Sequence, residues 1–137
     1  MKTKTQSEFR EFFIGFLTCA LWSSYDNSTE SGGEPFDANY TRHDIAFSSL
    51  LSMARECRDF MQANSDDLSA FCSEYSPTGN FSEIECAGHD FWLTKNGHGV
   101  GFLDRGLSDL GKRLSAASKV YGSTDLYLGD DGKIYAS

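Results

Sequence analysis

The sequence predicts an α+β fold, with N-terminal helices packed on a small antiparallel sheet made of two hairpins that flank a C-terminal helix. Apolar residues at helical spacing dominate the first 75 or so residues. Strong turn signals, Asn96-Gly97 and Gly129 to Gly132, then mark two hairpins. The 137 residues suit one domain with one core, so we expect a single domain over 1–137, with a helical part at about 7–75 and a hairpin-helix-hairpin part at about 86–136.

The first helix is expected from about Ser7 to Ser24, with Ser7 as its N-cap. Its large apolar side chains recur at three- and four-residue spacing: Phe9, Phe12, Phe13, Phe16, Leu17 and Leu21. This spacing forms one stripe that indicates a core-facing surface. The acidic, glycine-containing stretch from Tyr25 to Tyr40 then predicts a loop.

Two more helices are expected before residue 76. The second should begin at Thr41, because Thr41 and Asp44 have capping-box spacing. Its expected buried stripe comprises Phe47, Leu50, Leu51, Ala54, Cys57 and Met61. A short third helix should follow with Ser65 as its cap, and Leu68, Phe71, Cys72 and Tyr75 turned inward.

A β-hairpin is expected around Asn96-Gly97, with a first strand from His89 to Thr94. A two-residue turn would pair Leu93 with Val100 and His89 with Asp104, near enough to hydrogen bond. It would also place Trp92 across from Gly101, with Gly99 on the diagonal.

A fourth helix is expected from about Leu107 to Tyr121, ended by Gly122 in the left-handed conformation. Gly111 inside it predicts a close contact, because glycine costs helix stability relative to alanine. The second hairpin should comprise Leu126 to Leu128, a turn at Gly129 to Gly132, and Lys133 to Ala136. The two hairpins are expected to join in one sheet, since an isolated hairpin is marginal in water.

The chain is acidic, with 12 Lys and Arg against 20 Asp and Glu and a formal net charge of −8. Such a surface repels phosphate backbones, so direct nucleic-acid binding is not expected, while docking on a basic partner is favoured. No signal peptide or membrane-spanning stretch is recognised, and the four widely spaced cysteines do not form a disulfide pattern. These features predict a cytoplasmic protein without membrane association.

The segment from Gly88 to Gly106 carries the candidate site residues, and the residues alone leave four interpretations open. The first is a purely structural, glycine-rich hairpin. The second is a catalytic site in which Asp104 orients His89, although no recognisable nucleophile motif accompanies them.

The third interpretation is a zinc site formed by Cys72, Cys86, His89 and His98, which the absence of a Cys-x-x-Cys pair disfavours. The fourth is a cradle of backbone amides that binds a phosphate-bearing small molecule with Lys95, His98 and Arg105. We expect no metal, no cofactor and no catalytic residue. The candidate binding residues are His89, Asp90, Trp92, Lys95, Asn96, His98, Asp104 and Arg105.

The run Gly-His-Asp-Phe-Trp-Leu-Thr-Lys-Asn-Gly-His-Gly-Val-Gly-Phe-Leu-Asp-Arg-Gly at 88–106 resembles a family of small proteins of tailed phages and prophages. Its members typically read Gly-His-Asp-Phe-Trp-Leu-Thr-Arg-Asn-Gly-His-Gly-Ala-Gly-Phe-Trp-Asp-Arg-Gly. This chain differs by Lys95, Val100 and Leu103. Further similar stretches are Ala20 to Ser24, Asp37 to Tyr40 and Asp125 to Lys133, so the resemblance extends over nearly the whole chain.

The resemblance implies a protein that acts in the host cytoplasm during infection or from a prophage, without an agreed activity. By analogy with other small phage proteins, we expect an acidic accessory protein that binds and inhibits a host protein, as an anti-restriction, anti-CRISPR or nucleic-acid-mimic factor. Its partner would carry a basic nucleic-acid-binding groove. The alternative is a small-molecule binder or hydrolase that uses the hairpin from His89 to Arg105.

Overall fold

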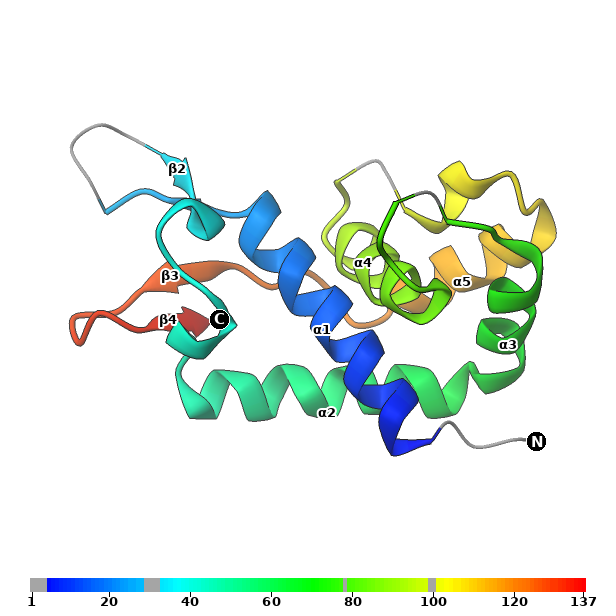
Figure 1. Cartoon of the computed structure of the whole chain (residues 1–137), viewed down its shortest axis with the longest axis horizontal. Helices are drawn as coiled ribbons and strands as arrows, with labels where there is room; N and C mark the ends of the chain where they lie inside the picture. The colour runs from blue at the N-terminus through cyan, green and yellow to red at the C-terminus, as the bar shows by residue number, and fades with distance from the viewer. Residues whose placement is uncertain (1–4, 29–32, 78, 99–100) are drawn as a thin grey trace.

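A computed structural model describes residues 5–28, 33–77, 79–98 and 101–137 (Figure 1). These residues form an α+β structure of helices with two small antiparallel sheets. The α-helices are α1 (Gln6–Ser23), α2 (Phe47–Ala63), α3 (Ser65–Glu74), α4 (Glu83–Lys95) and α5 (Asp109–Lys119). Short 3-10 helices are η1 (Phe36–Ala38), η2 (Arg42–Asp44) and η3 (Phe102–Arg105), and the strands are β1 (Tyr25–Asp26), β2 (Glu34–Pro35), β3 (Leu126–Leu128) and β4 (Ile134–Ala136).

Helix α1 runs diagonally through the molecule, with both small sheets near its C-terminal end and helices α3 and α5 on the opposite side (Figure 1). It begins at Gln6, because Thr5 and Glu8 form a capping box, so the expectation of Ser7 as the cap is wrong. The predicted apolar stripe is confirmed as core at Phe12, Phe16, Leu17 and Leu21, whereas Phe9 and Phe13 are half-buried. The described helices include none long and apolar enough to cross a bilayer.

Helix α4 packs on α1 at backbone contact, and two glycines make this possible. A Cβ atom on Gly15 would collide with the carbonyl oxygen of Glu85, and one on Gly88 would collide with the carbonyl oxygen of Phe12. Each helix therefore supplies a glycine where the other helix's backbone passes. A side chain at either position would force the two helices apart.

The predicted hairpin at residues 89–104 is wrong, because residues 83–95 are helical. Ser82 and Glu85 form a capping box at the start of α4. At its end the N–H of Gly97 bonds to the carbonyl of Thr94, and that of His98 to the carbonyl of Leu93. This is the Schellman pattern, with Gly97 in the left-handed conformation at φ 68°.

The expected hairpin register is therefore not formed, and two of its residues, Gly99 and Val100, lie outside the described part of the chain. The residues after α4 return as η3, which packs against α4 and α5. The single sheet expected from two joined hairpins is not formed either, because the first hairpin is absent. Instead β1 pairs with β2 inside the predicted loop, and β3 pairs with β4 in a separate sheet.

The C-terminal hairpin is confirmed, with Leu126 opposite Ala136 and Leu128 opposite Ile134. It rests on the segment before α2, where the N–H of Ala46 donates to the carbonyl of Ile134 at 2.8 Å. Helix α5 is also confirmed, although it is shorter than predicted. A Cβ on Gly111 would lie 2.8 Å from the carbonyl oxygen of Phe102, which accounts for the glycine.

Helix α2 departs from its prediction in start and in burial. The Thr41–Asp44 capping box is present, but it caps η2, and α2 begins only at Phe47. Of the expected stripe, Cys57 and Met61 are buried, whereas Phe47 and Leu51 are exposed. Helix α3 starts at Ser65 itself, with Asn64 as its N-cap residue and without a side-chain capping bond.

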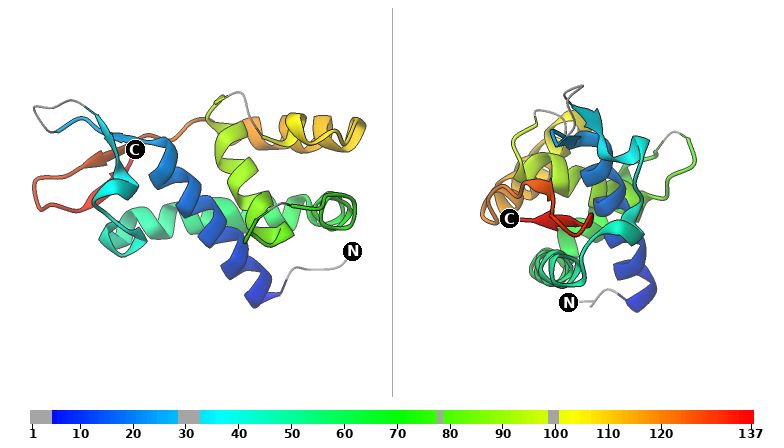
Figure 2. Two further views of the ribbon diagram at one scale, coloured as in Figure 1. Left: turned by 45° about the horizontal axis from the view of Figure 1, so that its top comes forward. Right: turned by 90° about the vertical axis from the view of Figure 1, so that its left-hand side faces the viewer.

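The core is rich in aromatic rings, contributed by helices from both halves of the chain. The Phe60 ring of α2 stacks on the Phe91 ring of α4, with centroids 4.1 Å apart. Phe16 of α1 and Phe102 of η3 lie against the same pair. Figure 2 (left) shows α4 at the centre of this arrangement, with α1 on one side, α5 on the other and α2 running below.

Replacing Gly88 by alanine tests the α1–α4 contact. In an open helix the change would stabilise by about 1 kcal/mol, because alanine has the higher helix propensity. Here we expect a loss of about 3 kcal/mol in the free energy of unfolding, since the added methyl group meets the Phe12 backbone. Urea denaturation measures the change, and Thr18→Ala, at an exposed position of α1, is the matched control. A neutral or stabilising Gly88→Ala would contradict the packing.

Candidate functional site

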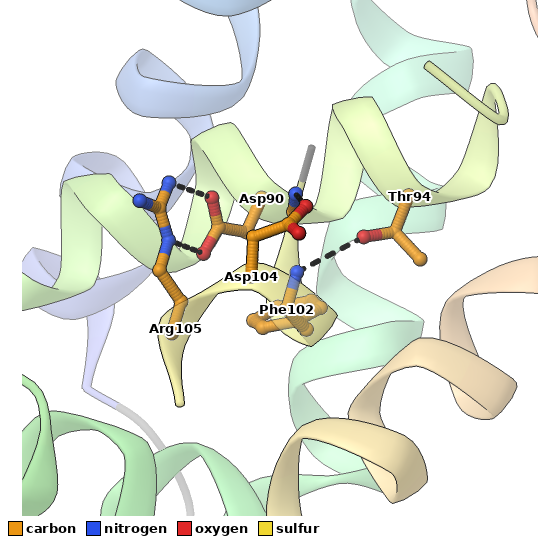
Figure 3. A network of polar contacts seen from close by, with 6 residues as sticks. Asp90, Thr94, Phe102, Asp104 and Arg105 are labelled. Carbon is orange, nitrogen blue, oxygen red and sulfur yellow. Dashed lines mark hydrogen bonds and ion pairs between the residues drawn. The ribbon is translucent and has the colours of Figure 1, made fainter. Parts of the chain in front are cut away.

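The central feature of the predicted motif is an ion pair between Asp90 of α4 and Arg105 of η3. Arg105 Nη2 lies 2.6 Å from Asp90 Oδ1, and Arg105 Nε lies 2.9 Å from Asp90 Oδ2, a bidentate arrangement (Figure 3). The Asp90 side chain is fully buried, whereas that of Arg105 remains partly exposed. The pair fastens the segment after α4 back on α4.

The pKa values of this pair reflect burial and mutual attraction. Burial raises the pKa of Asp90, and the guanidinium of Arg105 offsets part of that rise. The hydrogen bond to Asp90 raises the pKa of Arg105 above its usual value. Without Arg105, the rise that burial causes in the pKa of Asp90 would be largely uncompensated.

Asp104 serves the local structure of η3. Its Oδ2 atom accepts the N–H of Gly101 at 3.1 Å, and its own N–H donates to the Gly101 carbonyl. The hydroxyl of Thr94 accepts the N–H of Phe102 at 3.3 Å, so the start of η3 is held on α4 (Figure 3). The expected pairing of His89 with Asp104 in a hairpin is therefore wrong.

Lys95 and Asn96 fix the end of α4 to distant parts of the chain. The buried ammonium group of Lys95 lies 2.8 Å from Glu56 Oε1 and donates to the hydroxyl of Thr124 at 2.7 Å. The Asn96 side chain donates to the Trp92 carbonyl at 2.9 Å and accepts the N–H of Thr124 at 2.7 Å. These bonds tie α2 and the approach to β3 onto α4.

Trp92 is buried as well, and its indole N–H donates to the hydroxyl of Ser23 on α1 at 2.7 Å. Six of the predicted binding residues therefore support the fold: Asp90, Trp92, Lys95, Asn96, Asp104 and Arg105. The phosphate cradle was expected on a hairpin that does not form. Its two cations, Lys95 and Arg105, are each paired with a carboxylate.

The remaining predicted residues, His89 and His98, lie beside an exposed aromatic surface. Trp22, Tyr25 and Phe81 are 55%, 54% and 44% exposed. The His89 ring lies 6.1 Å from the Trp22 ring and 5.9 Å from the Phe81 ring, measured between centroids. Trp22 and Tyr25 also line a hollow of about 360 Å³ together with His98. We call these five residues, Trp22, Tyr25, Phe81, His89 and His98, the aromatic face.

The aromatic face has acidic neighbours. Glu83, in the first turn of α4, follows Phe81 by two residues and is exposed. Glu34 is exposed beside Pro35, which lines the same hollow as Tyr25. Burial lowers the pKa of His89, which favours its neutral form and keeps this part of the surface free of added positive charge.

Sequence reasoning missed Trp22, Tyr25 and Phe81 as surface residues. The available signal for Trp22 was its position outside the apolar stripe of α1, which indicates exposure. The positions of Tyr25 and Phe81 depend on how the loops pack, and no local pattern reveals that.

The proposed zinc set is not brought together. Among the residues that the structure describes, no group of three or more His, Cys, Asp or Glu side chains is arranged to hold a metal ion. Cys72 lies on α3, while His98 lines the hollow of the aromatic face. Burial raises the pKa of the Cys86 thiol, which disfavours the thiolate that binds zinc.

No protein-family model, curated protein or solved structure matches this chain. The interpretation of the site therefore rests on its geometry and chemistry.

Replacing Arg105 by methionine tests the buried ion pair. The variant leaves the buried Asp90 carboxylate unpaired, so we expect a loss of about 3–5 kcal/mol in the free energy of unfolding near pH 8. Asp90→Asn should cost less, because the stranded Arg105 is partly exposed to water. Arg113→Met breaks an exposed pair with Asp67 and should change stability little.

The Arg105→Met loss should also depend on pH. Burial holds the folded-state pKa of Asp90 above its unfolded value, so the folded variant binds the additional proton. Its stability deficit relative to the unaltered protein should therefore shrink as the pH falls from 8 to 5. Thermal unfolding at these two pH values measures the difference, and a deficit that grows on acidification would argue against an unpaired carboxylate.

Proposed function

We propose that this chain is a phage- or prophage-encoded accessory protein that works without catalysis, by binding a host protein through the aromatic face and inhibiting it. The single observation that carries the proposal is the exposure of Trp22, Tyr25 and Phe81 on one surface. Trp and Tyr are enriched among the residues that dominate binding energy at protein interfaces. The solvent exposure of these three large aromatic side chains on a well-packed protein therefore supports a docking role.

The charge of the molecule supports a basic partner. The chain carries a net charge of −8, and exposed Glu34 and Glu83 lie near the aromatic face. Carboxylates around an apolar centre resemble the usual arrangement of an interface, with a dry core and a polar rim. A basic surface, such as the nucleic-acid-binding groove of a host defence complex, would be attracted over a long range and would then bury the aromatic side chains.

An anti-restriction, anti-CRISPR or nucleic-acid-mimic role is the specific form of this proposal. It rests on the resemblance of residues 88–106 to phage and prophage proteins, together with the acidic charge. The residues of this motif contribute to binding indirectly, by supporting the helix that carries His89. Trp92 of the motif bonds to Ser23 of α1 and Lys95 pairs with Glu56 of α2, which holds α4 against both helices and so places His89 beside Trp22.

Capture from host lysate with the tagged protein tests the proposal. The unaltered protein should retain a specific partner, and Trp22→Ala with Tyr25→Ala should lose it. With the purified partner, the double change should raise Kd about 30-fold or more, the effect of removing an interface hot spot. The matched control replaces the exposed Val120 and Tyr127 by alanine, at sites outside the aromatic face.

Salt provides a second measurement on the same complex. The association rate should fall as ionic strength rises, because the attraction between an acidic rim and a basic partner is screened. The proposal fails if the partner binds the Trp22/Tyr25 variant as tightly as the unaltered protein, or if the control variant loses binding to the same extent.

A further inference from the structure

A groove of different chemistry lies between α1 and α2, on residues that the proposed function does not use. Its walls are formed by Phe9, Phe13 and Ile14 of α1 and by Leu50 of α2, and residues 42 and 43 of η2 also line it. The space measures about 600 Å³, within the range of ligand and peptide sites. These four apolar residues are half-buried, so part of each side chain remains accessible to a ligand in the groove.

The apolar surface continues beyond the groove along α2. Phe47 is 73% exposed and Leu51 is 39% exposed. Residues 47, 51 and 58 are four and seven positions apart, so they follow one line along the helix, beside Leu50 on the groove wall. Apolar surface that is contiguous and rimmed by polar residues is a feature of docking sites.

The rim of the groove is cationic, although the chain as a whole is acidic. Arg10, Arg42 and Arg58 supply three of its 12 Lys and Arg residues, and no carboxylate is among the lining residues. Within the described residues, none of these three guanidinium groups forms an ion pair. Arg58 instead lies over the Phe9 ring, 4.4 Å from its centroid. The nearby Asp44 carboxylate is engaged by the N–H of Thr41.

We propose that this groove binds an acidic, amphipathic peptide segment of a partner protein. The apolar face of the segment packs on Phe9, Phe13 and Leu50 and extends over Phe47. Its carboxylates pair with the arginines on the rim, for which Arg is well suited because its fork matches a carboxylate. An open groove with apolar walls fits a helix that keeps its outer side in water.

The charge and shape select this occupant among others. A nucleic acid would meet the repulsion of a net charge of −8 and would gain little from aliphatic and aromatic walls. A small anion would leave the exposed Phe47 and Leu51 uncovered. The charge of the groove rim is also opposite to that around the aromatic face, whose acidic neighbours favour a basic partner. The two proposals therefore concern different partners and are tested independently.

Selection from a displayed library of random peptides tests the inference. Peptides about 15 residues long are used, enough for roughly four helical turns. We expect enriched sequences to combine Asp or Glu with apolar residues at three- and four-residue spacing. Their binding is then measured with synthetic peptides by fluorescence anisotropy.

The binding site is checked with charge reversals on the rim. Arg10→Glu with Arg42→Glu should weaken binding of the selected peptides at least about tenfold, because attraction becomes repulsion. Arg55→Glu, at an exposed position of α2 that does not line the groove, is the matched control and should have little effect. All changed residues are exposed, so thermal unfolding should be unaltered in both variants.

Three outcomes would overturn the inference. The first is a selection without enrichment, or with enrichment of basic or uncharged sequences. The second is binding that the Arg10/Arg42 variant retains in full. The third is concentration-dependent self-association in sedimentation that this variant abolishes, which would make a second copy of the chain the occupant.

Discussion

The backbone contact between α1 and α4 is the constraint on which the rest of the structure depends. Gly15 and Gly88 leave no room for a side chain where the two helices meet. Close approach brings Phe12 and Phe16 of α1 against Phe91, and the aromatic core then extends to α2 and η3. A helix held this tightly is buried on almost every side, so its polar residues need partners inside the protein.

Those internal partners explain why a motif rich in His, Asp, Lys and Arg acts as a scaffold. Asp90 is neutralised by Arg105, and Lys95 by Glu56, and each pair joins α4 to a different part of the chain. An intact buried ion pair adds little net stability, because both charges lose their hydration. Removing one partner is strongly destabilising, because it leaves an uncompensated buried charge. The surfaces left for binding are at the edges of the scaffold: the aromatic face and the arginine-rimmed groove.

Local signals predicted much of the fold, and the failures have physical causes. Helices α1 and α5 and the C-terminal hairpin followed from periodicity and turn residues. Asn96-Gly97 was ambiguous, because a hairpin turn and a Schellman cap both place glycine at positive φ. An almost fully buried helix also lacks an amphipathic period. For the site, the exposure of Tyr25 and Phe81 depends on long-range packing that periodicity does not encode.

Residues 83–95 should form a helix lying against α1 in solution, and nuclear Overhauser spectroscopy measures this directly. We predict strong contacts between sequential amide protons through residues 83–95, together with contacts between the Hα protons of Gly88 and the backbone of Phe12. Strong contacts from each Hα to the following amide through residues 89–94, with cross-strand contacts between the Hα protons of Trp92 and Gly101, would instead establish the hairpin and contradict the helix.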